Sequence, residues 1–329
     1  MTPTVDRFVR PPRDRPDVPA HAGLIGRLPT AVNVISLHIV NTHHIGAVQT
    51  PSRAVLVTGC SSGLGRATAL AFAGAGFPTW ASARRLTDMR ELEQAGCRVL
   101  ELDVTDEQSR RAAVRRVEAE HGAVGVLVNN AGHGGGGPVE EVPLTMVRET
   151  FETNVFGLIG MCQLALPGMR AQRAGMIVNI GSAAGLVTPP TGCPYAMTKY
   201  ALEALCDAMR PEVRPFGVRV VLIEPGSVRT EFLANSARYA PAESETGVYE
   251  VYKNSVAAMI ARAHHDRARG VLAAADVAAI IVKAATAKHP KARYRIGAQA
   301  RIAPLARRTL GDGGWDAVMR RLVPFPGPA

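Results

Sequence analysis

From Arg53 onward, short apolar runs alternate with longer stretches of helical character. This alternation is typical of a parallel sheet whose strands are joined by crossover helices. The predicted strands cover residues 54–57, 77–83, 97–102, 126–128, 176–180, 218–223 and 294–296. The pattern therefore predicts an α/β fold, with a single doubly wound, Rossmann-type parallel sheet that carries helices on both faces.

The stretches between these strands are predicted to be helical. Thr105 and Gln108 have the spacing of a capping box, which predicts that a charged helix starts here and runs to His121. Five further helices are predicted. The first runs from a glycine-containing loop to about residue 75, and the second covers 87–95. The third is a long helix that starts at about 145, the fourth ends near 211, and the fifth covers 276–287.

Three regions are expected along the chain. Residues 1–52 are rich in Pro, Arg and His without a sustained period, which predicts an extension that is mobile. Residues 53–300 form the predicted nucleotide-binding catalytic domain, including a substrate lid at about 231–270. Residues 301–329 are predicted to form a basic tail.

The positive charge is concentrated near the end of the sequence. From Lys288 onward, nine Lys or Arg residues and two Asp residues supply +7 of the net charge of +10. No recognition motif or interleaved aromatic residue accompanies these charges, which favours a solvated tail over nucleic-acid binding. Weak adhesion to an anionic membrane surface, helped by Leu305, Leu310 and Trp315, remains open.

Cysteine and histidine usage argues against disulfides and metals. The five cysteines, Cys60, Cys97, Cys162, Cys193 and Cys206, are odd in number and scattered, which favours a reducing cytoplasm. The histidine pairs at 43–44 and 264–265 have no partners at zinc-ligand spacing, so we expect no metal. No apolar run reaches the length of a membrane span.

A glycine-rich loop follows the first predicted strand and precedes a helix. Gly59, Gly63 and Gly65 permit a tight turn there, and main-chain N–H groups at the helix start are suited to a pyrophosphate. The loop therefore predicts dinucleotide binding, although its spacing differs from G-x-G-x-x-G. Arg84 and Arg85 end the second strand without a carboxylate beside them, which favours the 2'-phosphate of NADP.

Tyr195 and Lys199 are four residues apart and therefore share one face of a helix. The ammonium group is expected to lower the pKa of the phenol, which makes the tyrosine a usable proton donor or acceptor. Bringing the pKa from about 10 to about 7 takes roughly 4 kcal/mol, more than one exposed lysine provides. We therefore expect a second positive charge nearby, such as an oxidised nicotinamide ring.

The sequence over about 53–297 resembles the short-chain dehydrogenase/reductase family. The motifs that carry the resemblance are the loop at 58–65, Asp103-Val104, Asn129-Asn130-Ala131-Gly132, Asn154, Ser182, Tyr195 with Lys199, and the turn at 225–230. The segments 139–143 and 151–157 are most similar to the branch with 17-beta-hydroxysteroid dehydrogenase type 1, retinol dehydrogenases and acyl-dihydroxyacetone-phosphate reductases.

The resemblance implies roles for four catalytic residues. Tyr195 is the general acid in carbonyl reduction, and Ser182 stabilises the developing alkoxide. Lys199 also holds the nicotinamide ribose, and the side chain or a freed carbonyl of Asn154 holds a water that relays protons to Lys199. The residues expected to bind NADP(H) are Gly59, Ser61, Ser62, Gly63, Leu64, Gly65, Arg84, Arg85, Asp103, Val104, Asn130, Tyr195, Lys199, Val228 and Thr230.

The substrate region is expected to be open and apolar. Four glycines at 134–137 predict a wide or mobile segment, and His133 before them is expected to be an exposed loop residue. The lid at 231–270 contains Tyr239, Tyr249 and Tyr252, and an apolar wall is expected from Leu186, Val187 and Cys193.

The resemblance implies an NADP(H)-dependent oxidoreductase that interconverts a ketone or aldehyde and an alcohol. The expected substrate is lipophilic, such as a steroid, a retinoid or an acyl chain, and the expected assembly is a homodimer or homotetramer. Two other functions remain open: a sugar-nucleotide epimerase or dehydratase, which shares the Tyr and Lys, and a non-catalytic protein that senses the cofactor.

Overall fold

The computed structural model describes residues 50–236, 247–264 and 270–323. The chain divides into two units, Met1–Val48 and Gln49–Ala329, and all the described residues belong to the second. The predicted extension at 1–52 therefore lies almost wholly outside the described residues, as do Tyr239 of the predicted lid, the histidine pair at 43–44 and His265.

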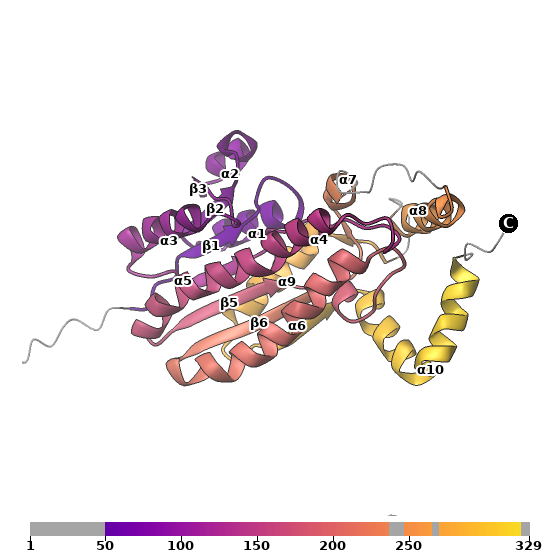
Figure 1. Cartoon of the computed structure of the whole chain (residues 1–329). Coiled ribbons are helices and arrows are strands. Elements are labelled where there is room, and N and C mark those ends of the chain that lie inside the picture. The colour runs from indigo at the N-terminus through magenta and orange to yellow at the C-terminus, as the bar shows by residue number, and fades with distance from the viewer. Residues whose placement is uncertain (1–49, 237–246, 265–269, 324–329) are drawn as a thin grey trace, which may run out of the picture. The chain divides into compact units, whose positions relative to one another are not determined.

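A seven-stranded parallel sheet organises this unit (Figure 1). The strand order is β3-β2-β1-β4-β5-β6-β9, and the direction of progression reverses between β1 and β4. The strands are β1 (Val55–Thr58), β2 (Thr79–Ala83), β3 (Arg98–Glu101), β4 (Val126–Asn129), β5 (Gly175–Ile180), β6 (Val218–Pro225) and β9 (Arg293–Ile296). This strand order confirms the predicted doubly wound fold. In sheets of this kind, ligands bind at the carboxyl ends of the strands where the order reverses, here between β1 and β4.

Helices cover both faces of the sheet, because the strand residues alternate between two apolar clusters. Leu56 packs toward α3, α5 and α6, whereas its neighbours Val55 and Val57 pack toward α1, α2 and α9. Burial of one such side chain stabilises the fold by about 1.5–3 kcal/mol. The helices are α1 (Gly63–Gly74), α2 (Arg90–Gln94), α3 (Glu107–His121), α4 (Leu144–Phe151), α5 (Leu158–Ala171), α6 (Cys193–Val213) and α9 (Ala274–Thr286).

Further elements lie beyond the carboxyl ends of the last strands. Two short parallel strands, β7 (Val228–Arg229) and β8 (Leu272–Ala273), pair with each other. The helices α7 (Phe232–Ser236) and α8 (Glu250–His264) fall within the predicted lid. The predicted tail starts inside a helix, α10 (Ala298–Leu322), which is interrupted at Gly311, where φ is 65°.

One local prediction was wrong. The capping box is not formed, because Asp106 caps α3 by accepting a hydrogen bond from Ser109 N at 2.6 Å. Thr105 is unavailable, since its hydroxyl donates to Asp103 Oδ1 at 2.7 Å. The long helix predicted from about residue 145 is confirmed: α4, a π-helical segment (Glu152–Gly157) and α5 follow one another without a break from Leu144 to Ala171.

Candidate active site

The candidate site lies at the carboxyl ends of the central strands. Tyr195 and Lys199 lie in the first two turns of α6, and Ser182 lies two residues after the end of β5. Lys199 Nζ is 5.4 Å from the centre of the Tyr195 ring and donates to the carbonyl oxygen of Ile180 at 2.7 Å. The structure therefore brings the three predicted residues together, with Lys199 anchored to the end of β5.

The Ser182 hydroxyl forms two hydrogen bonds, one that caps a turn and one with Tyr195. Its hydroxyl oxygen accepts a hydrogen bond from Ala184 N at 3.1 Å and so caps the short 3₁₀ turn Ala183–Gly185. It is also hydrogen-bonded to Tyr195, and this bond lowers the pKa of the phenol. The cap fixes the hydroxyl in place beside the tyrosine.

Burial dominates the titration of the catalytic pair. It raises the pKa of Tyr195 to about 12, against the smaller lowering effect of the bond with Ser182. Burial also lowers the pKa of Lys199 to about 8. The protein's own groups thus do not give Tyr195 the low pKa that the sequence predicts, because desolvation of the phenolate outweighs them. A further positive charge is needed for the phenolate form.

The side chain of Asn154 is hydrogen-bonded within the protein. Its side chain lies in the π-helical segment and donates to His133 O at 2.9 Å and to Thr198 Oγ1 at 3.1 Å. Its Oδ1 accepts from His133 N at 3.0 Å. Both side-chain N–H groups are therefore bonded within the protein, so neither is left to donate to a water. A relay from the main-chain carbonyl of Asn154 stays a prediction.

Sequence reasoning missed Thr198. Its hydroxyl donates to the carbonyl oxygen of Tyr195 at 2.7 Å and accepts from Asn154, so it joins α6 to the segment that holds His133. No sequence signal separates this threonine from an ordinary helix residue, because its partner is 44 positions away.

The glycine loop is packed closely against the end of β4. A Cβ on Gly65 would overlap the carbonyl oxygen of Gly59 and the side-chain amide of Asn130. Asn130 Nδ2 donates to the carbonyl oxygens of Thr58 and Gly59, at 2.9 and 3.1 Å. Asn130 therefore holds the loop in shape, which is a supporting role at the place where the sequence predicts a cofactor contact.

The N-terminus of α1 is suited to an anion. Ser62 is the N-cap residue, but its side chain does not cap the helix, and the first turn contains no acidic residue. Ser61 precedes it, and Leu64 lies in the first turn. Thr230 closes the loop from the other side, since its Cβ lies 3.0 Å from the place of a Cβ on Gly63. Val228, two residues earlier, lies on β7 and packs against the core.

The two arginines after β2 have different surroundings. Arg85 pairs with Asp88 at 2.9 Å, whereas Arg84 is exposed and forms no hydrogen bond or ion pair with any residue that the structure describes. Sequence reasoning missed Arg66 of α1, which donates to the carbonyl oxygens of Ser61 and Asp88. Arg66 thus links the glycine loop to the segment after β2, and Arg85 is paired within that segment. The side chain of Arg84 is available for a ligand.

The predicted adenosine-side residues follow β3. Asp103 Oδ1 accepts from Thr105 N at 2.9 Å and from the Thr105 hydroxyl, which forms a tight turn. The side chain of Val104 is buried in the core, and its carbonyl oxygen accepts from Arg110 at 2.6 Å. Main-chain groups of both residues are thus already used within the protein, since Asp103 N also donates to Ser109 Oγ at 3.0 Å.

The glycines at 134–137 are packed closely against other segments, in place of the wide segment that the sequence predicts. Gly134 N donates to Ser236 Oγ at 3.1 Å, and Gly137 N donates to Thr191 O at 2.9 Å. A Cβ on Gly136 would overlap the carbonyl oxygen of Thr191. Glycine is needed because other segments approach the backbone closely. His133 is half-buried rather than exposed, and burial lowers its pKa.

The described part of the predicted lid contacts the site through α7. The ring of Phe232 lies 5.4 Å from that of Tyr195. Tyr249 is turned away, since its hydroxyl donates to Glu140 at 2.7 Å, and Tyr252 lies on α8. Leu186, Val187 and Cys193 are half-buried between Ser182 and Tyr195 in the chain, where the sequence predicts an apolar wall.

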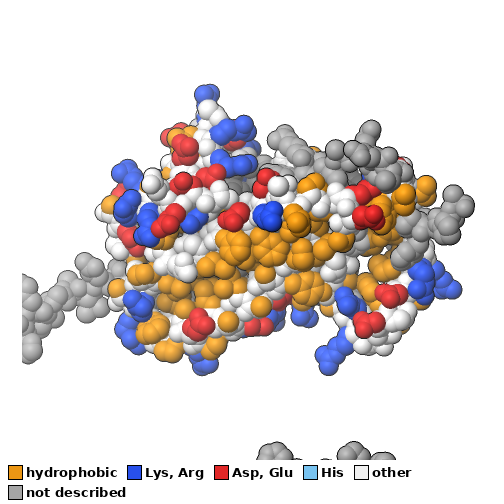
Figure 2. Space-filling view, in the orientation of Figure 1, with side chains coloured by type: hydrophobic (Ala, Val, Ile, Leu, Met, Phe, Trp, Pro, Cys, Tyr) orange, Lys and Arg blue, Asp and Glu red, His pale blue; other side chains and the backbone are white. Residues whose placement is uncertain are grey.

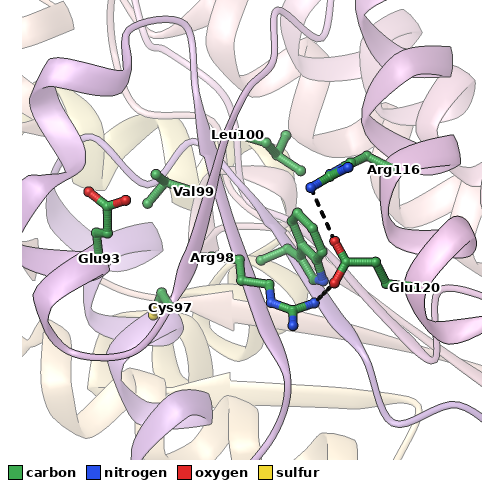
Figure 3. Close-up of a pocket in the computed structure, with 8 residues that line it drawn as sticks. Glu93, Cys97, Arg98, Val99, Leu100, Arg116 and Glu120 are labelled. Carbon is green, nitrogen blue, oxygen red and sulfur yellow. Dashed lines mark hydrogen bonds and ion pairs between the residues drawn. The ribbon is translucent and has the colours of Figure 1, made fainter.

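A cavity of about 460 Å³ lies elsewhere, at the β2–β3 edge of the sheet (Figure 3). Glu120 pairs there with Arg98 and, at 3.3 Å, with Arg116. None of the predicted site residues lines this cavity; its lining is Trp80, Glu93, Cys97, Arg98, Val99, Leu100, Arg116 and Glu120. Because Glu120 is already paired with both arginines and the cavity lies at the edge of the sheet, away from the predicted site, we interpret it as a surface depression and not as an active site.

The described residues contain neither a metal-ligand cluster nor a membrane-spanning helix. Among the described residues, no three His, Cys, Asp or Glu side chains lie together as metal ligands would. No helix within the described ranges is both long and apolar enough to cross a membrane. All five cysteines carry free thiols.

The model of the short chain dehydrogenase family matches residues 53–240. The uncharacterized oxidoreductase YusZ of Bacillus subtilis is 32% identical over 275 residues, which cover 81% of this chain and 96% of that protein. The NADPH-dependent 3-dehydrocapnine reductase of Ornithobacterium rhinotracheale is 34% identical over 251 residues, with 74% and 87% covered. The 3-ketodihydrosphingosine reductase of Bacteroides thetaiotaomicron is 38% identical over 182 residues, with 55% and 66% covered.

Solved structures agree in fold. A short-chain dehydrogenase from Streptomyces avermitilis has a TM-score of 0.67 at 31% identity, over 83% of this chain and 96% of that one. A serine dehydrogenase in complex with NADP+ has a TM-score of 0.65 at 27% identity, over 74% and 94%. A short chain dehydrogenase/reductase from Burkholderia phymatum in complex with NAD has a TM-score of 0.67 at 24% identity, over 85% of this chain and 98% of that one. Both cofactors thus occur among proteins of this fold.

Proposed function

Because this chain belongs to the short-chain dehydrogenase family, we propose that it is an NADP(H)-dependent enzyme that interconverts a ketone or aldehyde and an alcohol on a lipophilic substrate. The observation that carries the proposal is the convergence of Ser182, Tyr195 and Lys199 at the carboxyl end of β5. A phenol, a hydroxyl and an ammonium group around one point supply the proton donor, the oxyanion partner and the compensating charge of carbonyl reduction.

The nicotinamide cofactor supplies or accepts the hydride when it is bound. Tyr195 is neutral at pH 7 because burial raises its pKa to about 12, so its hydroxyl holds the proton that a carbonyl oxygen needs. Ser182 donates a hydrogen bond to the same oxygen as negative charge develops on it. Lys199, held by Ile180, provides positive charge beside the phenolate that remains. In the oxidative direction Tyr195 accepts the proton instead.

Three features of this chain support NADP(H) as the cofactor. The N-terminus of α1 has no side-chain cap, and its first turn contains no acidic residue, which suits a pyrophosphate. Arg84 at the end of β2 is exposed without a partner among the described residues, which suits a 2'-phosphate. Asp88, the nearby carboxylate, is already paired with Arg85. One relative's name, the NADPH-dependent 3-dehydrocapnine reductase, points the same way.

A lipophilic substrate is supported by the side chains around Tyr195. Phe232 packs on its ring, and Leu186, Val187 and Cys193 lie between Ser182 and Tyr195 in the chain. These four side chains are all uncharged, which favours an apolar substrate. The relative named as a 3-ketodihydrosphingosine reductase agrees with reduction of a keto group on such a molecule.

We also propose a homodimer or homotetramer. Three large apolar side chains are exposed on neighbouring elements. Phe156, in the π-helical segment before α5, is exposed by 53%, and Met197 and Tyr200 on α6 are each exposed by 40%. Figure 2 shows hydrophobic side chains gathered across this face of the molecule. Apolar patches of this kind are typical of subunit interfaces, and a second copy of the chain is the expected partner.

The test is a titration of the purified protein with NADPH and NADH, followed by a carbonyl panel with the preferred cofactor. We expect NADPH to be preferred and apolar ketones or aldehydes to be reduced. Tyr195→Phe is expected to abolish turnover and to leave NADPH affinity nearly unchanged, because only the proton donor is removed. Retained turnover would refute the mechanism, and isomerisation of a sugar nucleotide without net cofactor consumption would support the epimerase alternative.

A further inference from the structure

Helix α10 begins at the same edge of the sheet as the candidate site. It follows β9, which runs parallel to β6, so its first turn lies at the carboxyl ends of the strands. Ala300 is fully buried, and Gln299 Oε1 accepts from the main-chain N–H and the hydroxyl of Ser227, both at 2.9 Å. Ser227 directly precedes β7, and Thr230 directly follows it. The start of α10 is therefore fixed to the rim of the site.

The first arm of α10, from Ala298 to Leu310, has one exposed side with mixed character. At about 100° per residue, positions 301, 305 and 308 fall in one strip, with 302 next to it. Ile302 and Leu305 are each exposed by 63%, and Arg301 and Arg308 are exposed on either side of Leu305. We call these four residues the α10 face. Figure 2 shows Lys and Arg side chains over α10 together with Asp or Glu side chains.

We propose that the α10 face docks on the surface of an anionic lipid bilayer, with Ile302 and Leu305 among the acyl chains and Arg301 and Arg308 at the phosphates. Apolar side chains with two arginines along one edge match the layering of a bilayer surface, in which acyl chains lie beneath charged headgroups. The proposal rests on the proposed function, because docking at this edge presents the site to a lipophilic substrate held in the membrane.

Other occupants fit the charge less well. A second copy packed through the same face would set arginines against arginines, which opposes a symmetric contact. The N-terminal residues 1–49 carry five arginines and three aspartates, so they are also positive in sum. The whole chain carries a net charge of +10, which adds long-range attraction to an anionic surface.

The test is flotation of the full-length protein with vesicles of phosphatidylcholine alone or mixed with phosphatidylglycerol. We expect binding to the mixed vesicles at low salt, and at least a fivefold loss of the bound fraction with phosphatidylcholine alone or in about 0.5 M salt, because exposed charges are screened. Ile302→Gln with Leu305→Gln, and separately Arg301→Gln with Arg308→Gln, are each expected to lower the bound fraction at least fivefold.

A matched control removes two exposed arginines elsewhere. Arg115→Gln with Arg214→Gln has the same change in net charge but lies on α3 and after α6, and we expect it to bind nearly as the unchanged protein does. Equal loss in this control, or no flotation of the unchanged protein, would overturn the proposal. A change of native mass in the Ile302/Leu305 variant would instead assign the face to a second copy and overturn it too.

Activity separates this proposal from the proposed function. NADPH turnover with a short, water-soluble aldehyde is expected to be the same in all these variants without vesicles, because the α10 face does not touch the catalytic residues. Absence of turnover in the unchanged protein would count against the enzyme, whereas absence of flotation counts against docking alone.

Discussion

Asn154 donates a side-chain hydrogen bond to the hydroxyl of Thr198 at 3.1 Å, and that hydroxyl donates in turn to the carbonyl oxygen of Tyr195 at 2.7 Å. The π-helical segment is thereby joined to the turn of α6 that carries the proton donor. Thr198 does not touch the reacting atoms, so it acts as a positioning residue for Tyr195.

Thr198→Val is expected to lower stability by about 1–3 kcal/mol, because one buried N–H of Asn154 then lacks its acceptor. We also expect kcat to fall while the KM for NADPH stays nearly constant, since the tyrosine is displaced and the cofactor loop is not. Urea unfolding and steady-state kinetics measure both effects. Thr198→Ser keeps the hydroxyl and is the matched control; equal behaviour of the two variants would argue against the positioning role.

Substitution of Arg84 and of Arg85 is expected to affect the preference for NADPH over NADH to different extents. Arg84→Ala removes a guanidinium without a partner among the described residues, and we expect the KM for NADPH to rise tenfold or more, or about 1.4 kcal/mol, with little change for NADH. Arg85→Ala removes a residue already paired with Asp88, so a smaller and less selective change is expected. A preference for NADH in the unchanged protein would refute the role given to Arg84.

Gly65→Ala is expected to abolish cofactor binding. The new Cβ would overlap Gly59 O and the amide of Asn130, and the loop must open to admit it. Gly74→Ala lies in the same helix with nothing within 4 Å of the new Cβ, and it is expected to stabilise the protein by about 0.5–1 kcal/mol. Fluorescence titration with NADPH and thermal unfolding distinguish the two. Tight NADPH binding by Gly65→Ala would contradict the packing of the loop.

Lys199→Met is expected to inactivate the enzyme and to stabilise its fold at neutral pH. Burial lowers the pKa of Lys199 from 10.5 to about 8, so below pH 8 the folded protein must hold a buried charge that the unfolded chain exposes to water. This penalty, at most about 3 kcal/mol, fades as the pH rises from 8 to 10.5. Loss of the bond to Ile180 offsets about 1 kcal/mol of the gain.

Urea unfolding at pH 7 and at pH 10.5 measures this effect of pH. The gain of Lys199→Met is expected to be largest at pH 7 and to disappear at the higher pH. Lys283→Met, at an exposed position of α9, is the control and is expected to show no such dependence. A variant that gains stability only at high pH would show the opposite sign and exclude a buried charged lysine.

Local patterns predicted the elements well and their ends less well. Four consecutive buried residues mark β1, and the prediction for 54–57 differs from Val55–Thr58 by one position. The predicted start of α3 was wrong because Thr105 and Asp106 are both good N-cap residues. Which of them caps the helix depends on the hydrogen bond between Thr105 and Asp103. For 301–329 the charge was predicted, but the helix α10 was not.

The sequence by itself determined the alternation of strands and helices, the glycine loop and the pairing of Tyr195 with Lys199. These features depend on spacings within one element, which the geometry of helices and strands fixes. Tertiary structure alone decided that Arg84 is available while Arg85 is paired, that Thr198 supports Tyr195, and that burial sets the pKa of the catalytic pair. These outcomes depend on contacts between distant segments and on the exclusion of water, which no local spacing encodes.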